Sequence, residues 1–173
     1  GGSLGRSEAT GFGVAVTARE AAAKLGIDLK GAKVAVQGFG NVGSYTVKNF
    51  IKLGGKVVAV AEWEPKNGTY VIYNEAGFCF EELKDYRTHN GNLLGFPGSQ
   101  AISLDEFWAL DVDVMVPAAL ENAIDAKQAE VIKAKLVVEA ANGPVTPAGD
   151  KVLNQRGITV TPDILSNAGG VTV

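Results

Sequence analysis

The 173-residue sequence predicts an α/β fold, namely a doubly wound, mostly parallel sheet with helices on both faces. Strand-like apolar runs alternate with helical runs through most of the chain, which favours parallel strands joined by helices. A Gly-x-Gly-x-x-Gly turn at residues 38–43 stands between the first such strand and the helix after it. These features are typical of a Rossmann-like dinucleotide-binding domain, and we expect a single domain over residues 1–173.

The first half of the chain is expected to form two helices and two strands around the turn. Residues 8–25 have alanines and valines at helical spacing and end at Gly26, which stops a helix. Residues 34–36 form a short buried strand, and residues 42–53 carry apolar side chains at helical spacing. Residues 56–62 are an apolar run that predicts the next parallel strand.

The second half continues the alternation after an Asn-Gly turn at residues 65–68. Short runs of β-branched and aromatic residues predict strands at residues 70–73, 112–116, 136–139 and 158–160. Amphipathic stretches between them predict helices at residues 80–89, 105–110, 123–133 and 147–156. Residues 90–100 are expected to form a loop.

Small or polar residues follow four of the predicted strands, at residues 38–43, 117–119, 141–144 and 163–170. Such residues are also ordinary in turns. Because ligands of doubly wound sheets bind beyond the carboxyl ends of the strands, their collection at one edge predicts a shared cleft.

Composition excludes several classes of partner. The formal net charge is -3, and no basic run or aromatic-interleaved basic patch is present, so we expect no nucleic acid and no membrane partner. No apolar run has membrane-spanning length, and the start of the chain does not look like a signal peptide. We therefore expect a cytoplasmic protein.

The single cysteine and the single histidine do not suggest chemistry. Cys79 stands between two phenylalanines and is expected to be a packed small hydrophobe rather than a nucleophile. His89 is expected at a helix end or in a loop, without the further ligands that a metal site needs. We expect no metal.

The glycines of the turn have separate mechanical tasks in a phosphate-binding loop. Gly38 allows the tight turn, Gly40 lets the backbone approach a pyrophosphate, and Gly43 lets the helix pack closely on the strand. The helix N-terminus adds N–H groups and partial positive charge. The turn lacks the Gly-Lys-Ser/Thr of a P-loop, which argues against nucleotide triphosphate hydrolysis.

Glu62 ends the second strand about twenty residues past the last glycine, where a carboxylate binds the ribose hydroxyls of a dinucleotide. A carboxylate there repels a 2′-phosphate, so the sequence favours NAD, with NADP less favoured. Glu64 adds negative charge, and Lys66 offsets part of it. The alternative is a solvated glutamate at a strand end.

Five stretches in order resemble one family. They are residues 1–11 (GGSLGRSEATG), 38–43 (GFGNVG), 116–121 (VPAALE), 139–144 (EAANGP) and 162–173 (PDILSNAGGVTV). Together they resemble the NAD(P)-binding domain, or domain II, of hexameric bacterial glutamate dehydrogenases, nearest the clostridial ones.

The resemblance implies roles for individual residues. It implies that Arg6, Thr10, Asn142 and Asn167 lie near the nicotinamide. The alternative for each asparagine is a turn or cap role. The pyrophosphate loop would be Gly38, Phe39, Gly40, Asn41, Val42 and Gly43. The adenosine half would be contacted by Glu62, Trp63, Ala118 and Ala119, and Val171 would be a substrate-wall residue.

The resemblance also implies a reaction, the oxidation of L-glutamate to 2-oxoglutarate and ammonia, in a parent enzyme that is a homohexamer. The family's catalytic lysines and aspartate lie on a substrate domain that nothing here matches. We therefore expect no catalytic residue in this chain, which would be an excised or engineered cofactor domain that binds NAD without turnover. The alternatives are a leucine, phenylalanine or valine dehydrogenase, or a non-catalytic dinucleotide-binding regulatory module.

Overall fold

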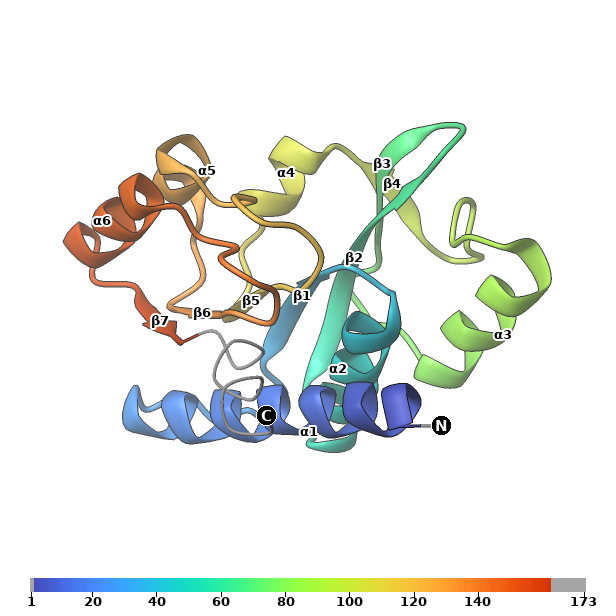
Figure 1. The fold of residues 1–173 in the computed structure, drawn as a ribbon, viewed down its shortest axis with the longest axis horizontal. Coiled ribbons are helices and arrows are strands. Elements are labelled where there is room, and N and C mark those ends of the chain that lie inside the picture. Colours follow the sequence, from blue (N-terminus) through green and yellow to red (C-terminus); the bar gives the residue numbers. More distant parts are fainter. Residues whose placement is uncertain (1, 163–173) are drawn as a thin grey trace.

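The computed structural model describes residues 2–162, without the side chains of residues 2–4, 6 and 7. Within this range one sheet of seven strands has the order β4-β3-β2-β1-β5-β6-β7. The strands are β1 (Lys33–Gln37), β2 (Lys56–Glu64), β3 (Gly68–Tyr73), β4 (Gln100–Ile102), β5 (Val114–Pro117), β6 (Leu136–Val138) and β7 (Thr159–Thr161). The helices are α1 (Gly2–Lys24), α2 (Asn41–Lys52), α3 (Phe80–Asn90), α4 (Leu104–Trp108), α5 (Ala126–Val131) and α6 (Pro147–Gln155). Figure 1 shows their arrangement.

The sheet confirms the predicted mostly parallel, doubly wound fold. Strands β2, β1, β5, β6 and β7 are parallel neighbours, and β3 and β4 add an antiparallel edge. The chain winds outward from β1 in both directions, so the strand order reverses between β1 and β5. In folds of this kind, ligands bind at such a reversal, beyond the carboxyl ends of the strands.

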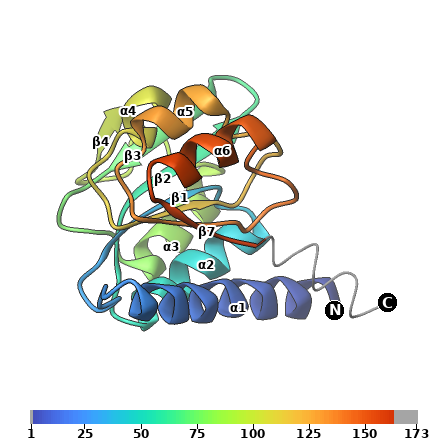
Figure 2. The ribbon, with the colours of Figure 1, turned by 90° about the vertical axis from the view of Figure 1, so that its left-hand side faces the viewer.

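Helices cover both faces of the sheet, as the sequence predicts. Figure 2 shows α1, α2 and α3 on one side of the strands and α4, α5 and α6 on the other. Strand side chains alternate between two cores, so Val34 and Val36 pack under the first set of helices while Ala35 packs under the second. Both layers are apolar and buried, which gives the strand ends a rigid support.

Four details differ from the sequence prediction. Helix α1 begins at Gly2 rather than at residue 8, because the low helix propensity of its glycines is only a weak constraint. Strand β4 begins at Gln100, the last residue of the predicted loop, and was not expected. Helix α5 begins three residues late because Asp125 caps it, accepting the Ala126 N–H, while its own N–H donates to the Gln128 side chain at 3.0 Å.

The fourth difference concerns Cys79, which is exposed rather than packed. Its backbone is extended, with φ -93° and ψ 126°, immediately before α3. Successive side chains of extended backbone point in opposite directions, so Phe78 packs into the core while Cys79 points away from it. The apolar neighbours therefore gave the wrong prediction.

Candidate functional site

Four adjacent strands, β2, β1, β5 and β6, are linked toward their carboxyl ends. Three backbone hydrogen bonds do this: Gly38 N to Ala61 O at 2.6 Å, Ala118 N to Gln37 O at 2.8 Å, and Ala140 N to Pro117 O at 3.0 Å. Three of the four predicted strand-end segments, residues 38–43, 117–119 and 141–144, therefore lie along one edge. The fourth, at residues 163–170, lies outside the described residues.

Two glycines of the turn are required by its geometry. Gly38 has φ +112°, and a Cβ there would meet the Ala118 carbonyl oxygen and the Ala119 Cβ at 3.1 Å. A Cβ on Gly43 would lie 2.2 Å from the Gly38 carbonyl oxygen, so helix α2 folds against its own turn only with glycine there. The turn is thus packed tightly from the sheet side.

Gly40 is different, because a Cβ there would meet no described atom within 4 Å apart from those of its two chain neighbours. Its backbone is extended, with φ -75° and ψ -156°, and it caps α2 without a side-chain hydrogen bond. The fold therefore does not need glycine at this position. A bare N-cap on a 12-residue helix leaves first-turn N–H groups and the positive end of the helix dipole for an anion.

Glu62 lies beside this turn but is not the solvated residue of the alternative interpretation. Its side chain is only 13 % exposed, and its Oε1 accepts the Phe39 N–H at 2.6 Å. Its Oε2 lies 3.6 Å from Nη2 of Arg87 on α3. The same guanidinium donates through Nη1 to the Phe39 carbonyl oxygen. Strand β2, the turn and helix α3 are thus joined through two charged side chains.

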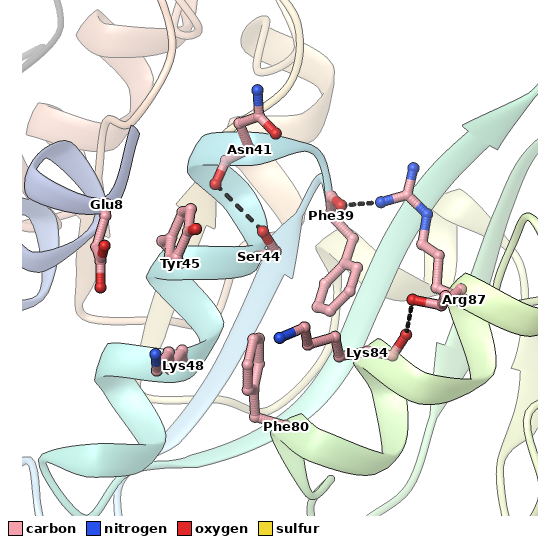
Figure 3. A pocket seen from close by; sticks show the side chains of 10 residues that line it. Glu8, Phe39, Asn41, Ser44, Tyr45, Lys48, Phe80, Lys84 and Arg87 are labelled. Atoms are coloured by element: carbon pink, nitrogen blue, oxygen red, sulfur yellow. Dashed lines mark hydrogen bonds between the residues drawn. The ribbon is translucent and has the colours of Figure 1, made fainter. Parts of the chain in front are cut away.

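Arg87 is a site residue that the sequence analysis missed. It lies 48 positions from Phe39 along the chain, and no local motif marks it. Figure 3 shows it beside Phe39, at the pocket between α2 and α3. That pocket has a volume of about 280 Å³, and its wall includes Lys48, Lys84 and Glu8. Cationic side chains therefore gather next to the turn.

The charged side chains at this end of the sheet also affect Tyr70, which lies opposite Glu62 on the neighbouring strand β3. Burial, more than any other cause, raises the pKa of the Tyr70 phenol above its usual value. The negative charges of Glu62 and Glu64 raise that pKa further, while the hydrogen bond from the Leu93 N–H and the Arg87 charge lower it. The phenol oxygen accepts that N–H at 2.8 Å.

The other predicted site residues are placed as follows. Thr10 is buried in α1, one residue from Gly11, where α1 comes close to Tyr45 of α2. Trp63 is 59 % exposed next to Glu62, Ala118 is half-buried, and Ala119 and Asn142 are exposed. Arg6 lies in α1, but its side chain, like Asn167 and Val171, lies outside what the structure describes.

Residues 2–162 contain no group of three histidine, cysteine, aspartate or glutamate side chains that could hold a metal ion. In the same range no helix has both the length and the apolar character needed to cross a membrane.

Comparisons with known proteins agree with this geometry. The family model for Glutamate/Leucine/Phenylalanine/Valine dehydrogenase matches residues 1–173. Over its whole length the chain is 68 % identical to the NAD-specific glutamate dehydrogenase of Clostridioides difficile and 60 % identical to that of Peptoniphilus asaccharolyticus. The aligned region is 41 % of each of these two relatives. A crystal structure of glutamate dehydrogenase from Peptoniphilus asaccharolyticus matches with a TM-score of 0.79 and 53 % identity, over 97 % of this chain and 37 % of that one. The chain therefore spans about two fifths of the length of these curated relatives.

Proposed function

Because the chain belongs to the Glutamate/Leucine/Phenylalanine/Valine dehydrogenase family, we propose that residues 1–173 are the NAD-binding domain, domain II, of a glutamate dehydrogenase. The observation that carries this proposal is the open position of Gly40 at the bare N-terminus of α2, with Glu62 beside it. Apart from the two chain neighbours of Gly40, no described atom lies within 4 Å of a Cβ built there, which leaves space for a pyrophosphate to approach the turn.

In the whole enzyme, L-glutamate, NAD and water would be converted to 2-oxoglutarate, ammonium, NADH and a proton. When bound, NAD supplies the hydride acceptor. The chain's own residues bind and orient it: residues 38–43 hold the pyrophosphate through backbone N–H groups, and Glu62 accepts from the adenine ribose. Small side chains at Ala118 and Ala119 leave room for the adenosine half.

The nicotinamide end is proposed to lie among Thr10, Asn142, Arg6 and Asn167, with Val171 facing the substrate. Proton transfer would be done by lysines and an aspartate of the family's substrate domain, and closure of the two domains would exclude water from the reacting atoms. We further propose a cytoplasmic, homohexameric parent enzyme. The names of the relatives that share 68 % and 60 % identity favour glutamate over leucine, phenylalanine or valine as the substrate.

Calorimetric titration of the chain with NADH tests the proposal, and we expect one NADH-binding site per chain. Addition of L-glutamate and NAD to the same protein is expected to yield no NADH, because the proton-transferring groups belong to the other domain. Absence of NADH binding would contradict the cofactor assignment. Robust glutamate-dependent NADH formation by residues 1–173 alone would contradict the assignment of the catalytic groups.

A further inference from the structure

Arg87 contacts both the proposed pyrophosphate loop and the carboxylate at the adenosine end of the proposed cofactor site. It donates to the Phe39 carbonyl oxygen of the turn, and its Nη2 lies 3.6 Å from Oε2 of Glu62. Its guanidinium carbon also lies 5.8 Å from the centroid of the Phe39 ring. These contacts fix the guanidinium next to the carboxylate that the ribose hydroxyls would meet.

The pair changes the electrostatic argument made from Glu62 alone. A bare carboxylate would reject a 2′-phosphate by charge repulsion, but here a cation compensates the carboxylate at short range. The Arg87 side chain is 35 % exposed and lines the pocket between α2 and α3, so a phosphate could reach it from solvent. Arginine is well suited to phosphate because its fork of N–H donors matches two phosphate oxygens.

The charged side chains that line the pocket favour the binding of a phosphate there, because cations outnumber anions in its wall. Lys84 and Lys48 line the same pocket, and Glu8 is the acidic residue of its wall. Lys48 lies over the rings of Tyr45 and Phe80, at 6.0 and 5.9 Å. On the hairpin beside Glu62, Glu64 accepts the Lys66 backbone N–H at 3.3 Å.

We propose that Arg87 is a second residue that determines the choice between NAD and NADP in this chain. With Glu62 ionised, the guanidinium is engaged by the carboxylate and the chain prefers NAD. Without that negative charge, the guanidinium becomes a direct partner of the 2′-phosphate of NADP. This inference rests on the proposed cofactor-binding function.

The test uses four variants of Glu62 and Arg87 and two pairs of ligands. Glu62→Gln removes the charge but keeps an oxygen that can accept the Phe39 N–H, and Arg87→Gln removes the guanidinium. Both are combined in the double variant, and a second double variant carries Glu62→Gln with Arg87→Lys. Each protein is titrated with NADH and NADPH, and with AMP and adenosine 2′,5′-bisphosphate; the members of each pair differ by the 2′-phosphate alone. Thermal unfolding shows that each variant is folded.

Glu62→Gln is expected to bind NADPH and adenosine 2′,5′-bisphosphate roughly tenfold or more tightly than the unmodified chain, as one gained charge-assisted contact allows. The Glu62→Gln, Arg87→Gln variant should lose that gain, and the variant with lysine should keep part of it. Lys66→Gln is the matched control, because it removes a positive charge from the β2–β3 hairpin, away from the turn at residues 38–43. It should change the ratio of NADPH to NADH affinity less than twofold, which is about the effect of one screened surface charge.

An equal gain of NADPH affinity in Glu62→Gln with and without Arg87 would overturn the inference, because removal of repulsion would then be sufficient. So would a Glu62→Gln variant that binds NADH and gains no NADPH affinity. If neither the unmodified chain nor any variant binds NADH or AMP, the proposed function fails instead, and the two failures are thus distinguished.

Discussion

Replacement of Gly40 by alanine separates ligand binding from folding at the turn. Apart from its two chain neighbours, the added methyl group would meet no described atom within 4 Å, and the extended backbone at φ -75° is open to alanine. We therefore expect the free energy of unfolding of Gly40→Ala to stay within about 0.5 kcal/mol of the unmodified chain, as for surface substitutions. The methyl group would instead occupy the space that a pyrophosphate needs.

The expected loss of affinity follows from the contacts that a displaced phosphate gives up. A hydrogen bond to a charged group contributes about 1.5–3 kcal/mol. Loss of one such bond from the first turn of α2 weakens NADH binding roughly 10- to 150-fold, since each 1.4 kcal/mol is a factor of ten. Calorimetric titration with NADH measures this loss, and urea denaturation measures the stability.

Two glycines serve as controls for Gly40→Ala. Gly5→Ala adds the same methyl group to α1, where it also meets nothing within 4 Å, and should leave NADH binding unchanged. Gly43→Ala places its Cβ 2.2 Å from the Gly38 carbonyl oxygen and should lower both stability and binding. A Gly40→Ala protein that binds NADH as tightly as the unmodified chain would refute the proposed path of the pyrophosphate, and one that unfolds would refute the open-space argument.

Three further predictions concern packing, pH and ligand contact. Gly11→Ala should lower the free energy of unfolding by about 1–3 kcal/mol in urea denaturation, because its Cβ would lie 2.6 Å from the Tyr45 Cβ; stability equal to that of Gly5→Ala would contradict this. The contribution of Tyr70 to the free energy of unfolding should be fully present below its ordinary pKa of 10.0 and be lost as the pH rises through the raised pKa of the folded chain, because the phenol of the unfolded chain ionises first. If Tyr70→Phe loses stability over the same pH range to the same extent, the assignment to Tyr70 is contradicted. NAD should protect the exposed Trp63 from acrylamide quenching, whereas Trp108, which is 2 % exposed, is shielded throughout; protection that persists in Trp63→Phe would place the ligand elsewhere.

The sequence predicted those features that depend on local patterns. Glycine spacing located the turn at residues 38–43, and the apolar runs located the five parallel strands, because each such signal lies within a few consecutive residues. Strand β4 was missed because three residues at a sheet edge, only one of them half-buried, carry too little pattern. Its formation depends on pairing with β3, which is a tertiary contact.

The placement of Glu62 shows why the candidate site was only partly predictable. Its position about twenty residues past the last glycine of the turn follows from spacing alone, and the structure places it in β2 beside the turn, with Oε1 2.6 Å from the Phe39 nitrogen. Its electrostatic surroundings depend on Arg87, which α3 brings in from 25 positions further along the chain. Because one charge-assisted contact can change the affinity for a cofactor about tenfold, a preference argued from the Glu62 carboxylate alone omits a contribution of the same size. On the proposed function, cofactor choice in this chain is therefore a property of the Glu62–Arg87 pair, and the experiment that varies both residues is the one that measures it.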